Sequence, residues 1–433
     1  MKIRTWKVGI AALALGASPV LAETSGWSYD NNVNGVAFAS DCCEPACGAD
    51  ECCDDVACGD GCGGGLCSGG LLGGLEGLSL AGLIGAEDSG WDFGGWTNVA
   101  YYDNNIPLSA VKNDLRSFDD IPDAANVAQQ WFYVGRVADG SGGLDLGARM
   151  DVLYGTDAQK TQSFGNPRSN GAAGERDSGT FDASWDHGTY GWAMPQLYLE
   201  VAYNDLSVKV GHFFTPLGYE VIPAGGNFFH SHSYTMFNSE PFTHTGALGT
   251  YTGMGEGLTL YGGWALGWDT GFDQLNSGNI AIGGFAYELA EDVTFTYLNT
   301  YGNFGLLDGG SKNSYSHSCV LTAGLTDNLQ YIAQSDLVRT DNPGVSQYDT
   351  VGLNQYLIYK LNDVISTGGR VEWWKADGTS YNQVTGGFNI HVLDNLVIRP
   401  EARYDWAPGT PTAIFPSGNI DEETFAVDAI LTY

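Results

Sequence analysis

Apolar and polar side chains alternate with a period of two from residue 91 to the C-terminus, and Gly, Asn and Asp recur between the alternating runs. This pattern indicates antiparallel strands with one apolar and one polar face. The clearest run is residues 396–406, in which Arg399, Glu401, Arg403 and Asp405 occupy alternate positions between apolar or aromatic residues. Helical periodicity is nearly absent. The pattern therefore predicts an all-β protein.

The links between the predicted strands alternate in length. We expect about sixteen strands, beginning near residues 91, 126, 143, 190, 206, 243, 257, 279, 292, 315, 329, 350, 364, 383, 396 and 423. Seven short turns alternate with eight long links, expected near residues 103–125, 156–189, 214–242, 269–278, 303–314, 339–349, 376–382 and 407–422. Short turns on one side and long loops on the other are typical of outer-membrane barrels, whereas a soluble β-sandwich has no reason for this alternation. We predict a transmembrane, antiparallel, up-and-down β-barrel over residues 91–433.

The first 22 residues have the features of a secretory signal peptide. A basic start at Lys2, Arg4 and Lys7 precedes an apolar stretch, and small Ala22 lies at the expected cleavage site. The apolar stretch is shorter than the roughly 18 residues that a membrane-spanning helix needs. We therefore predict export through a cleaved signal peptide. Since no later segment is long and apolar enough to span as a helix, residence in a membrane would require a closed barrel.

Residues 23–90 are predicted to form a periplasmic extension rich in Cys and Gly. Its eight cysteines are Cys42, Cys43, Cys47, Cys52, Cys53, Cys58, Cys62 and Cys67. An even number of cysteines in a short exported segment favours disulfides, with zinc ligation and unpaired thiols as the alternatives. The Leu- and Gly-rich residues 71–84 favour a flexible tether over an amphipathic segment that lies on another surface.

Composition narrows the function classes. The formal net charge is −33, which opposes binding to nucleic-acid phosphates. Only 16% of the residues are charged and 43% are hydrophobic, which excludes a disordered acidic chain. Gly is abundant, with 62 residues, so isolated Gly-rich stretches say little about nucleotide binding.

Several segments of the predicted barrel carry a family resemblance. The strongest is residues 211–246, GHFFTPLGYEVIPAGGNFFHSHSYTMFNSEPFTHTG. Shorter segments are GWDTGFD at 267–273, GNFG at 302–305, GLNQYLIYKLND at 352–363 and RPEARYDW at 399–406, and the last strand ends on aromatic Tyr433. These segments resemble the OmpL-like family of β-barrel porins of bacterial outer membranes. The resemblance covers residues 91–433 and implies an outer-membrane pore without catalytic residues or a cofactor; it does not extend to the cysteines.

A barrel of sixteen strands is wide enough to contain a water-filled channel. We therefore expect an outer-membrane porin that allows passive diffusion of small hydrophilic solutes or ions. The third long link, residues 214–242, is unusually apolar for a loop, and we expect it to fold inward and constrict the channel. The alternative is that it packs against the inner wall and plugs the opening.

Alternation along the strands, together with the third long link, identifies the candidate residues that line the pore or its constriction. They are Arg149, Asp151, Glu200, Lys209, Glu220, His230, His232, Glu240, Arg370, Glu372, Arg399, Glu401, Arg403 and Asp405. Their charges are of mixed sign, and much of the acidic excess lies in the loops and the N-terminal extension. We predict a weak preference for cations. Acidic loops could also bind divalent cations that bridge lipid headgroups, although simple solvation is the favoured explanation.

Two other chemistries are weaker interpretations of the same region. His230 and His232, with His212 and His244 nearby, suggest a metal site, but no carboxylate or cysteine completes a recognisable ligand set. Ser231 lies next to both histidines in the sequence, as Ser233 does to His232, but adjacent residues of an extended chain point apart, which makes a Ser–His nucleophile geometrically poor. We predict neither an enzyme nor a metal or cofactor site.

A rival interpretation is a structural or adhesive outer-membrane barrel that binds envelope or surface partners through its N-terminal extension and loops. A homotrimer is compatible with sixteen strands, but no residue specifies a subunit interface. The identity of the solute is also beyond the sequence.

Overall fold

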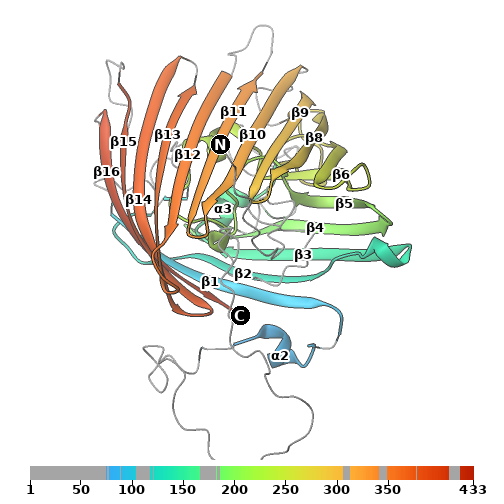
Figure 1. Cartoon of the computed structure of the whole chain (residues 1–433), viewed down its shortest axis with the longest axis horizontal. Coiled ribbons are helices and arrows are strands. Elements are labelled where there is room, and N and C mark those ends of the chain that lie inside the picture. The colour runs from blue at the N-terminus through green and yellow to red at the C-terminus, as the bar shows by residue number, and fades with distance from the viewer. Residues whose placement is uncertain are drawn as a thin grey trace, which may run out of the picture.

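The computed structural model describes residues 75, 78–87, 89–103, 118–119, 121–165, 182, 186–305, 313–340, 349–376, 378–408 and 420–433. These residues form a closed barrel in which each strand pairs antiparallel with the next along the chain. Figure 1 shows the wall running from β1 in blue to β16 in red. The predicted signal peptide and the eight clustered cysteines lie outside the described residues.

Sixteen strands make up the described barrel, as the alternation predicted. They are β1 (Asp92–Tyr102), β2 (Asn126–Arg136), β3 (Asp145–Gly155), β4 (Gly191–Tyr203), β5 (Leu206–Phe214), β6 (Thr243–Tyr251), β7 (Leu258–Ala265), β8 (Asn279–Ala290), β9 (Val293–Asn303), β10 (Ser314–Thr326), β11 (Leu329–Arg339), β12 (Asp349–Lys360), β13 (Ile365–Ala376), β14 (Thr379–Leu393), β15 (Leu396–Trp406) and β16 (Asp421–Thr432). The predicted and observed starts differ most at β14, by four residues (383 against 379).

The helices that the structure describes are short. They are α2 (Leu80–Ile84), α3 (Ala158–Thr161), α4 (Tyr234–Ser239) and the 3₁₀ turns η2 (Gly140–Gly142) and η4 (Ala224–Gly226). No helix among the described residues is long and apolar enough to cross a membrane.

The first and last strands close the barrel. Trp96 lies opposite Thr432, and Tyr102 lies opposite Ala426. The backbones of Gly95 and Tyr433 exchange two hydrogen bonds, at 2.9 and 3.0 Å, so the final residue takes part in the closure.

The two faces of the wall are inverted relative to a soluble barrel. In β4, Leu199 points outward and is 66% exposed, whereas Glu200 points inward and is 3% exposed. The same alternation recurs in β12, where Leu353 and Leu357 are exposed and Asn354 is buried. An apolar outer face and a polar inner face are what a barrel surrounded by hydrocarbon requires. The structure therefore confirms the predicted transmembrane barrel fold.

One predicted long link is wrong. β13 and β14 are joined by residues 377 and 378 alone, instead of a long link over residues 376–382. Ala376 pairs with Thr379 and Trp373 pairs with Asn382, so the strand ladder continues through the polar residues that suggested a loop. The sequence Asp377-Gly378 is a strong signal for a two-residue hairpin, and Gly378 has a positive φ of 92°. The other links follow the predicted alternation of short and long.

Candidate functional site

Residues 215–242, which link β5 to β6, lie against the inner wall of the barrel. We call them the inner segment; it contains η4 and α4. Most of its residues are buried, and its polar contacts reach inward-facing side chains of β2, β11, β12, β13 and β15. The chain can bury such a segment because these wall side chains satisfy its backbone polar groups.

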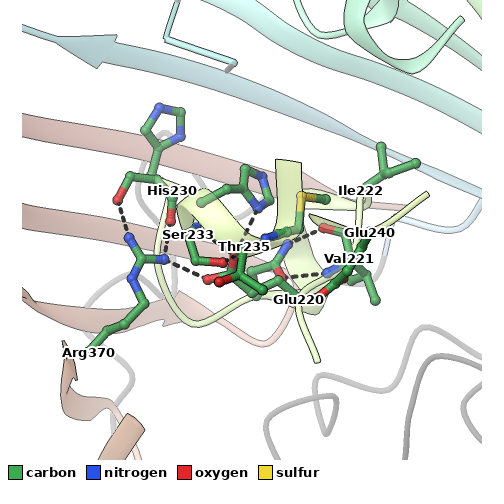
Figure 2. A network of polar contacts seen from close by, with 12 residues as sticks. Glu220, Val221, Ile222, His230, Ser233, Thr235, Glu240 and Arg370 are labelled. Atoms are coloured by element: carbon green, nitrogen blue, oxygen red, sulfur yellow. Dashed lines mark hydrogen bonds and ion pairs between the residues drawn. The ribbon is translucent and has the colours of Figure 1, made fainter. Parts of the chain in front are cut away.

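Arg370, on β13, is the central anchor of the inner segment. Its side chain is fully buried, and Nη1 lies 2.6 Å from Glu220 Oε1 and 2.7 Å from the Ser231 carbonyl oxygen. Figure 2 shows the guanidinium group reaching from its strand to the segment. Glu220 also accepts hydrogen bonds from the Tyr356 hydroxyl and the Ser233 N–H. Burial opposes the charge on Glu220, but Arg370, His232 and the Ser233 N–H outweigh burial and hold the pKa of the carboxyl well below its ordinary value.

Two carboxylates of the wall accept hydrogen bonds from backbone N–H groups of the inner segment. Glu401 accepts from the N–H groups of His230 and Ser231, at 2.7 and 3.2 Å. Glu372 accepts from the backbone and the hydroxyl of Thr235, at 2.8 and 2.7 Å. Hydrogen bonds to an ionised acceptor are stronger than neutral ones, so these two residues hold the middle of the segment in place.

Two arginines of β15 bind backbone carbonyl groups of the same segment. Arg399 donates to the carbonyl oxygens of Ala224, at 2.8 Å, and Asn227. Arg403 donates to the carbonyl oxygen of His232, at 2.6 Å. Donors and acceptors of the wall thus alternate along the backbone of the inner segment.

Every buried arginine of the described wall also has a carboxylate partner. Besides Arg370–Glu220, the pairs are Arg149–Asp151, Arg399–Asp428 and Arg403–Asp405. The positive charge of each of these four arginines is therefore locally compensated.

Aromatic packing completes the attachment of the inner segment. Phe228 and Phe229 join a buried cluster with Ile358 of the wall. The ring of Tyr234 stacks on Trp374, with centroids 5.8 Å apart. These contacts explain the high apolar content of this link, because the aromatic side chains are buried instead of lying in water.

Two inward glycines make room for the segment. A Cβ atom at Gly368 would lie 2.6 Å from Phe228, and one at Gly352 would lie 2.2 Å from the Thr235 hydroxyl. Both distances are shorter than any ordinary contact, so the wall approaches the inner segment closely where it lacks side chains.

His230 connects the inner segment to the first long link and to β16. Its Nε2 lies 3.4 Å from Asp119 and its Nδ1 lies 3.5 Å from Asp428. Its ring stacks on Tyr102. Burial disfavours a charged ring, but the two carboxylates outweigh burial and raise the pKa of His230 well above its ordinary value. His232 has a different neighbour, Glu220, at 3.7 Å.

The C-terminal end of the inner segment has a second acidic contact. Gln334 of β11 donates from one amide nitrogen to both Glu240 and Asp336. Burial, followed by the nearby Asp336 carboxylate, raises the pKa of Glu240 well above its ordinary value. Glu220, Glu240 and mostly apolar side chains line a cavity of about 20 Å³, which has room for about one water molecule.

Glu200 and Lys209 lie elsewhere on the inner wall, near its short turns. They face each other across β4 and β5 and are 3% and 4% exposed. Glu200 accepts from the Ala138 N–H and the Ser207 hydroxyl, and the Lys209 amine lies 4.9 Å from the Tyr198 ring centre. The structure thus places all the candidate residues on the inner wall or the inner segment; that they border a water path stays a prediction.

The described residues give no support to a metal site or a serine nucleophile. They contain no group of three or more His, Cys, Asp or Glu arranged to hold an ion. Ser231 Oγ accepts from Arg370, and Ser233 Oγ accepts from the Met236 N–H as the cap of α4. Cys319, the cysteine that the structure describes, forms no disulfide.

His212 and His244 do not join His230 in a common site. The His212 ring contacts the hydroxyls of Ser163 and Thr245, at 3.0 and 2.7 Å. His244 lies 3.1 Å from the Thr215 hydroxyl and 3.0 Å from the Gly267 carbonyl oxygen. Both histidines therefore form hydrogen bonds between long links and the ends of β5 and β6 on the long-link side of the barrel.

Two further inward residues, Gln129 and Asp428, were not predicted from the sequence. Gln129 donates to the Ile222 carbonyl oxygen at 2.9 Å and accepts from the Ala224 N–H at 3.0 Å. Being neutral, it carried no charge to single it out. Asp428 was detectable, because it continues the inward face of the last strand after Thr424.

Comparisons with known proteins agree with this architecture. The family model described as "Putative beta-barrel porin-2, OmpL-like" matches residues 90–433. Among solved structures, the anion-selective porin from Comamonas acidovorans is similar, with a TM-score of 0.52 and 10% identity over 79% of this chain and 99% of that chain. OmpT, an outer membrane protein of Vibrio cholerae in a trimer form, has a TM-score of 0.50 and 11% identity over the same shares. None of the curated proteins compared with the chain matches it.

Proposed function

Since the chain belongs to the family described as putative beta-barrel porin-2, OmpL-like, we propose that it is an outer-membrane channel for the passive diffusion of small hydrophilic solutes. The observation that carries this proposal is the closed wall of sixteen strands with an apolar outer face and a polar, charged inner face. A barrel of this strand number encloses enough space for water. The bacterial outer membrane is the expected location, reached through the predicted signal peptide.

The inner segment is the proposed constriction. It enters the barrel between β5 and β6 and is anchored at several points along its length, from Ala224 to Glu240. A segment held by charge-assisted hydrogen bonds narrows the interior without moving freely within it. Solutes would therefore pass beside a fixed partition, and four residues of the inner segment would border the path: Glu220, His230, His232 and Glu240.

We further propose that the channel prefers cations. The buried arginines of the described wall are each compensated by a carboxylate. In contrast, Glu372 and Glu401 bind neutral donors of the inner segment, so their charges add to a negative interior. Fixed charge along a pore attracts the opposite ion. The name of one similar structure describes an anion-selective porin, and this arrangement of charges argues for the opposite preference here.

Recordings of the purified full chain in planar bilayers test both statements. We expect discrete conductance steps, and in a KCl gradient a reversal potential of the sign given by K⁺ permeation. A reversal potential of the anion sign would refute the charge preference alone. A folded barrel that produces no steps and no swelling of solute-loaded liposomes would refute the channel and favour a structural or adhesive barrel.

The assembly state is also a proposal. One similar structure is described as a trimer, and we infer that this chain forms a homotrimer in the membrane. Light scattering of the detergent-solubilised protein measures the number of chains per particle, and a monomer would contradict the inference.

A further inference from the structure

The outer face of the wall contains a groove of about 360 Å³ across β14, β15 and β16. Its lining residues are Asp103, Val384, Gly386, Ala402, Arg403, Tyr404, Glu423, Thr424 and Phe425. Val384, Tyr404 and Phe425 belong to the outward face and are 42, 36 and 47% exposed. The groove therefore opens toward the surroundings of the barrel instead of its interior.

The groove forms where two neighbouring outward positions have small side chains or none. Gly386 pairs with Ala402, and Ala402 pairs with Phe425, so two small residues lie side by side on the outward face. A Cβ atom on Gly386 would meet nothing closer than 3.9 Å, which shows that the space above it is open. Val384, two residues before Gly386 along β14, and Phe425, opposite Ala402, form apolar walls of the depression.

The groove changes from apolar to acidic toward the long-link end of the barrel. The next row of outward residues toward the long links contains Val384, Tyr404 and Glu423. In this row Val384 pairs with Tyr404, and Tyr404 pairs with Glu423. Tyr404 stacks on Trp406, with ring centroids 5.5 Å apart, in the position of an interfacial aromatic girdle. Asp103 and Glu423 place two carboxylates in this rim. The apolar floor thus lies at hydrocarbon depth and the acidic rim at the level of lipid headgroups.

We propose that this groove binds one acyl chain of a lipid whose headgroup carries an amine, with the amine at the acidic rim. An apolar depression inside the hydrocarbon layer is filled by hydrocarbon, because polar groups would be left without partners there. The groove, at 360 Å³, is many times larger than the roughly 10–15 Å³ that one water molecule needs, so a stretch of acyl chain fits in it. The carboxylates of Asp103 and Glu423 then select a positively charged headgroup over an anionic one.

The lipid site requires the barrel to lie in a bilayer, but it does not require the barrel to conduct. Lipid retention and conductance therefore report on separate proposals.

Native mass spectrometry of the purified full chain tests the site. The protein is released from detergent that contains equal amounts of phosphatidylethanolamine and phosphatidylglycerol, with EDTA present to remove bridging divalent cations. We expect wild type to retain phosphatidylethanolamine. Gly386→Leu fills the groove and should lower that retention by about tenfold, because several buried methylene groups lose their contacts.

Gly262→Leu is the matched control. Gly262 is an outward glycine of β7 with no atom within 4 Å of the added Cβ, and β7 is not adjacent to β14, β15 or β16, so the same leucine meets lipid away from this groove. We expect wild-type retention. If Gly386→Leu fails to fold by circular dichroism, Ala402→Leu closes the same space.

Glu423→Gln isolates the headgroup preference. The ratio of phosphatidylethanolamine to phosphatidylglycerol should fall by about two- to fivefold, the range expected for one exposed ion pair. Equal retention by the wild type and the groove-filling variants would overturn the proposal. So would an unchanged lipid ratio in Glu423→Gln, or a groove-filling variant that alters the number of chains per particle while keeping its lipid, since a second copy of the chain would then occupy the groove.

Discussion

At the scale of single residues, the inner wall recognises backbone groups of the inner segment more than its side chains. Glu372 and Glu401 accept N–H groups, and Arg399 and Arg403 donate to carbonyl groups. Alternation in the sequence predicted that these residues face inward. It did not predict their partners, because the residues in contact are up to 175 positions apart in the chain and no local pattern encodes that pairing.

Replacing Arg370 by methionine should release the inner segment. The substitution leaves Glu220 buried without its cation, and breaking a buried ion pair in this way costs about 3–5 kcal/mol. We expect easier unfolding in guanidinium and larger, noisier conductance steps. The double variant Arg370→Met with Glu220→Gln removes both charges and should recover part of the stability; conductance identical to wild type in the single variant would show that Arg370 is not an anchor.

His230 should make stability depend on pH. Its folded-state pKa is raised above the unfolded value of about 6.5, so its contribution is complete below that value and is lost as pH rises through the raised folded-state pKa. Guanidinium unfolding of wild type and His230→Gln, measured from neutral to alkaline pH, should give a stability difference that shrinks with rising pH. Asp119 and Asp428 are the carboxylates that face the ring. A constant difference would exclude the charged histidine.

At the scale of secondary-structure elements, the strands were predictable and one turn was not. Period-two alternation reveals strands because each inward position differs chemically from its outward neighbours. The link between β13 and β14 was wrong because Thr379, Ser380 and Asn382 look like loop residues while they continue the ladder. The attachment of the inner segment to the wall depends on β2, β11, β12, β13 and β15 together, and the pattern of no single strand reveals it.

Gly368 and Gly369 provide an adjacent pair for testing that attachment. Gly368→Val should displace Phe228 and lower the free energy of unfolding by about 1–3 kcal/mol, as overpacking does. Gly369→Val points outward, where the nearest atom to its Cβ is 3.8 Å away, and should change stability by less than about 0.5 kcal/mol. Denaturant unfolding compares the two, and equal effects would mean that the inner segment does not press on β13.

At the scale of the whole molecule, the distribution of tryptophan distinguishes the two faces. Trp264 is 49% exposed on the outer face, whereas Trp96 and Trp131 are fully buried inside. Alternation alone did not predict that the apolar face points outward, because strands of soluble sheets show the same alternation with the apolar face buried. The lengths of the links were needed to distinguish the two cases.

Quenching by brominated lipids tests which face meets hydrocarbon. In vesicles, Trp264→Phe should remove a quenchable part of the tryptophan fluorescence, because its indole ring contacts acyl chains. Trp96→Phe is the inward control and should leave the quenched part unchanged. Equal losses in the two variants would contradict the orientation of the wall.

The bonds between Gly95 and Tyr433 extend the pairing that joins β1 to β16, the first barrel strand to the last. Until β16 has been synthesised, two strand edges carry N–H and C=O groups without partners, and in hydrocarbon each such group costs several kcal/mol. A growing polypeptide therefore gains nothing by entering the bilayer in stages. We therefore expect the unfolded chain to be kept soluble by chaperones and all sixteen strands to insert into the membrane together, after the last strand has been made.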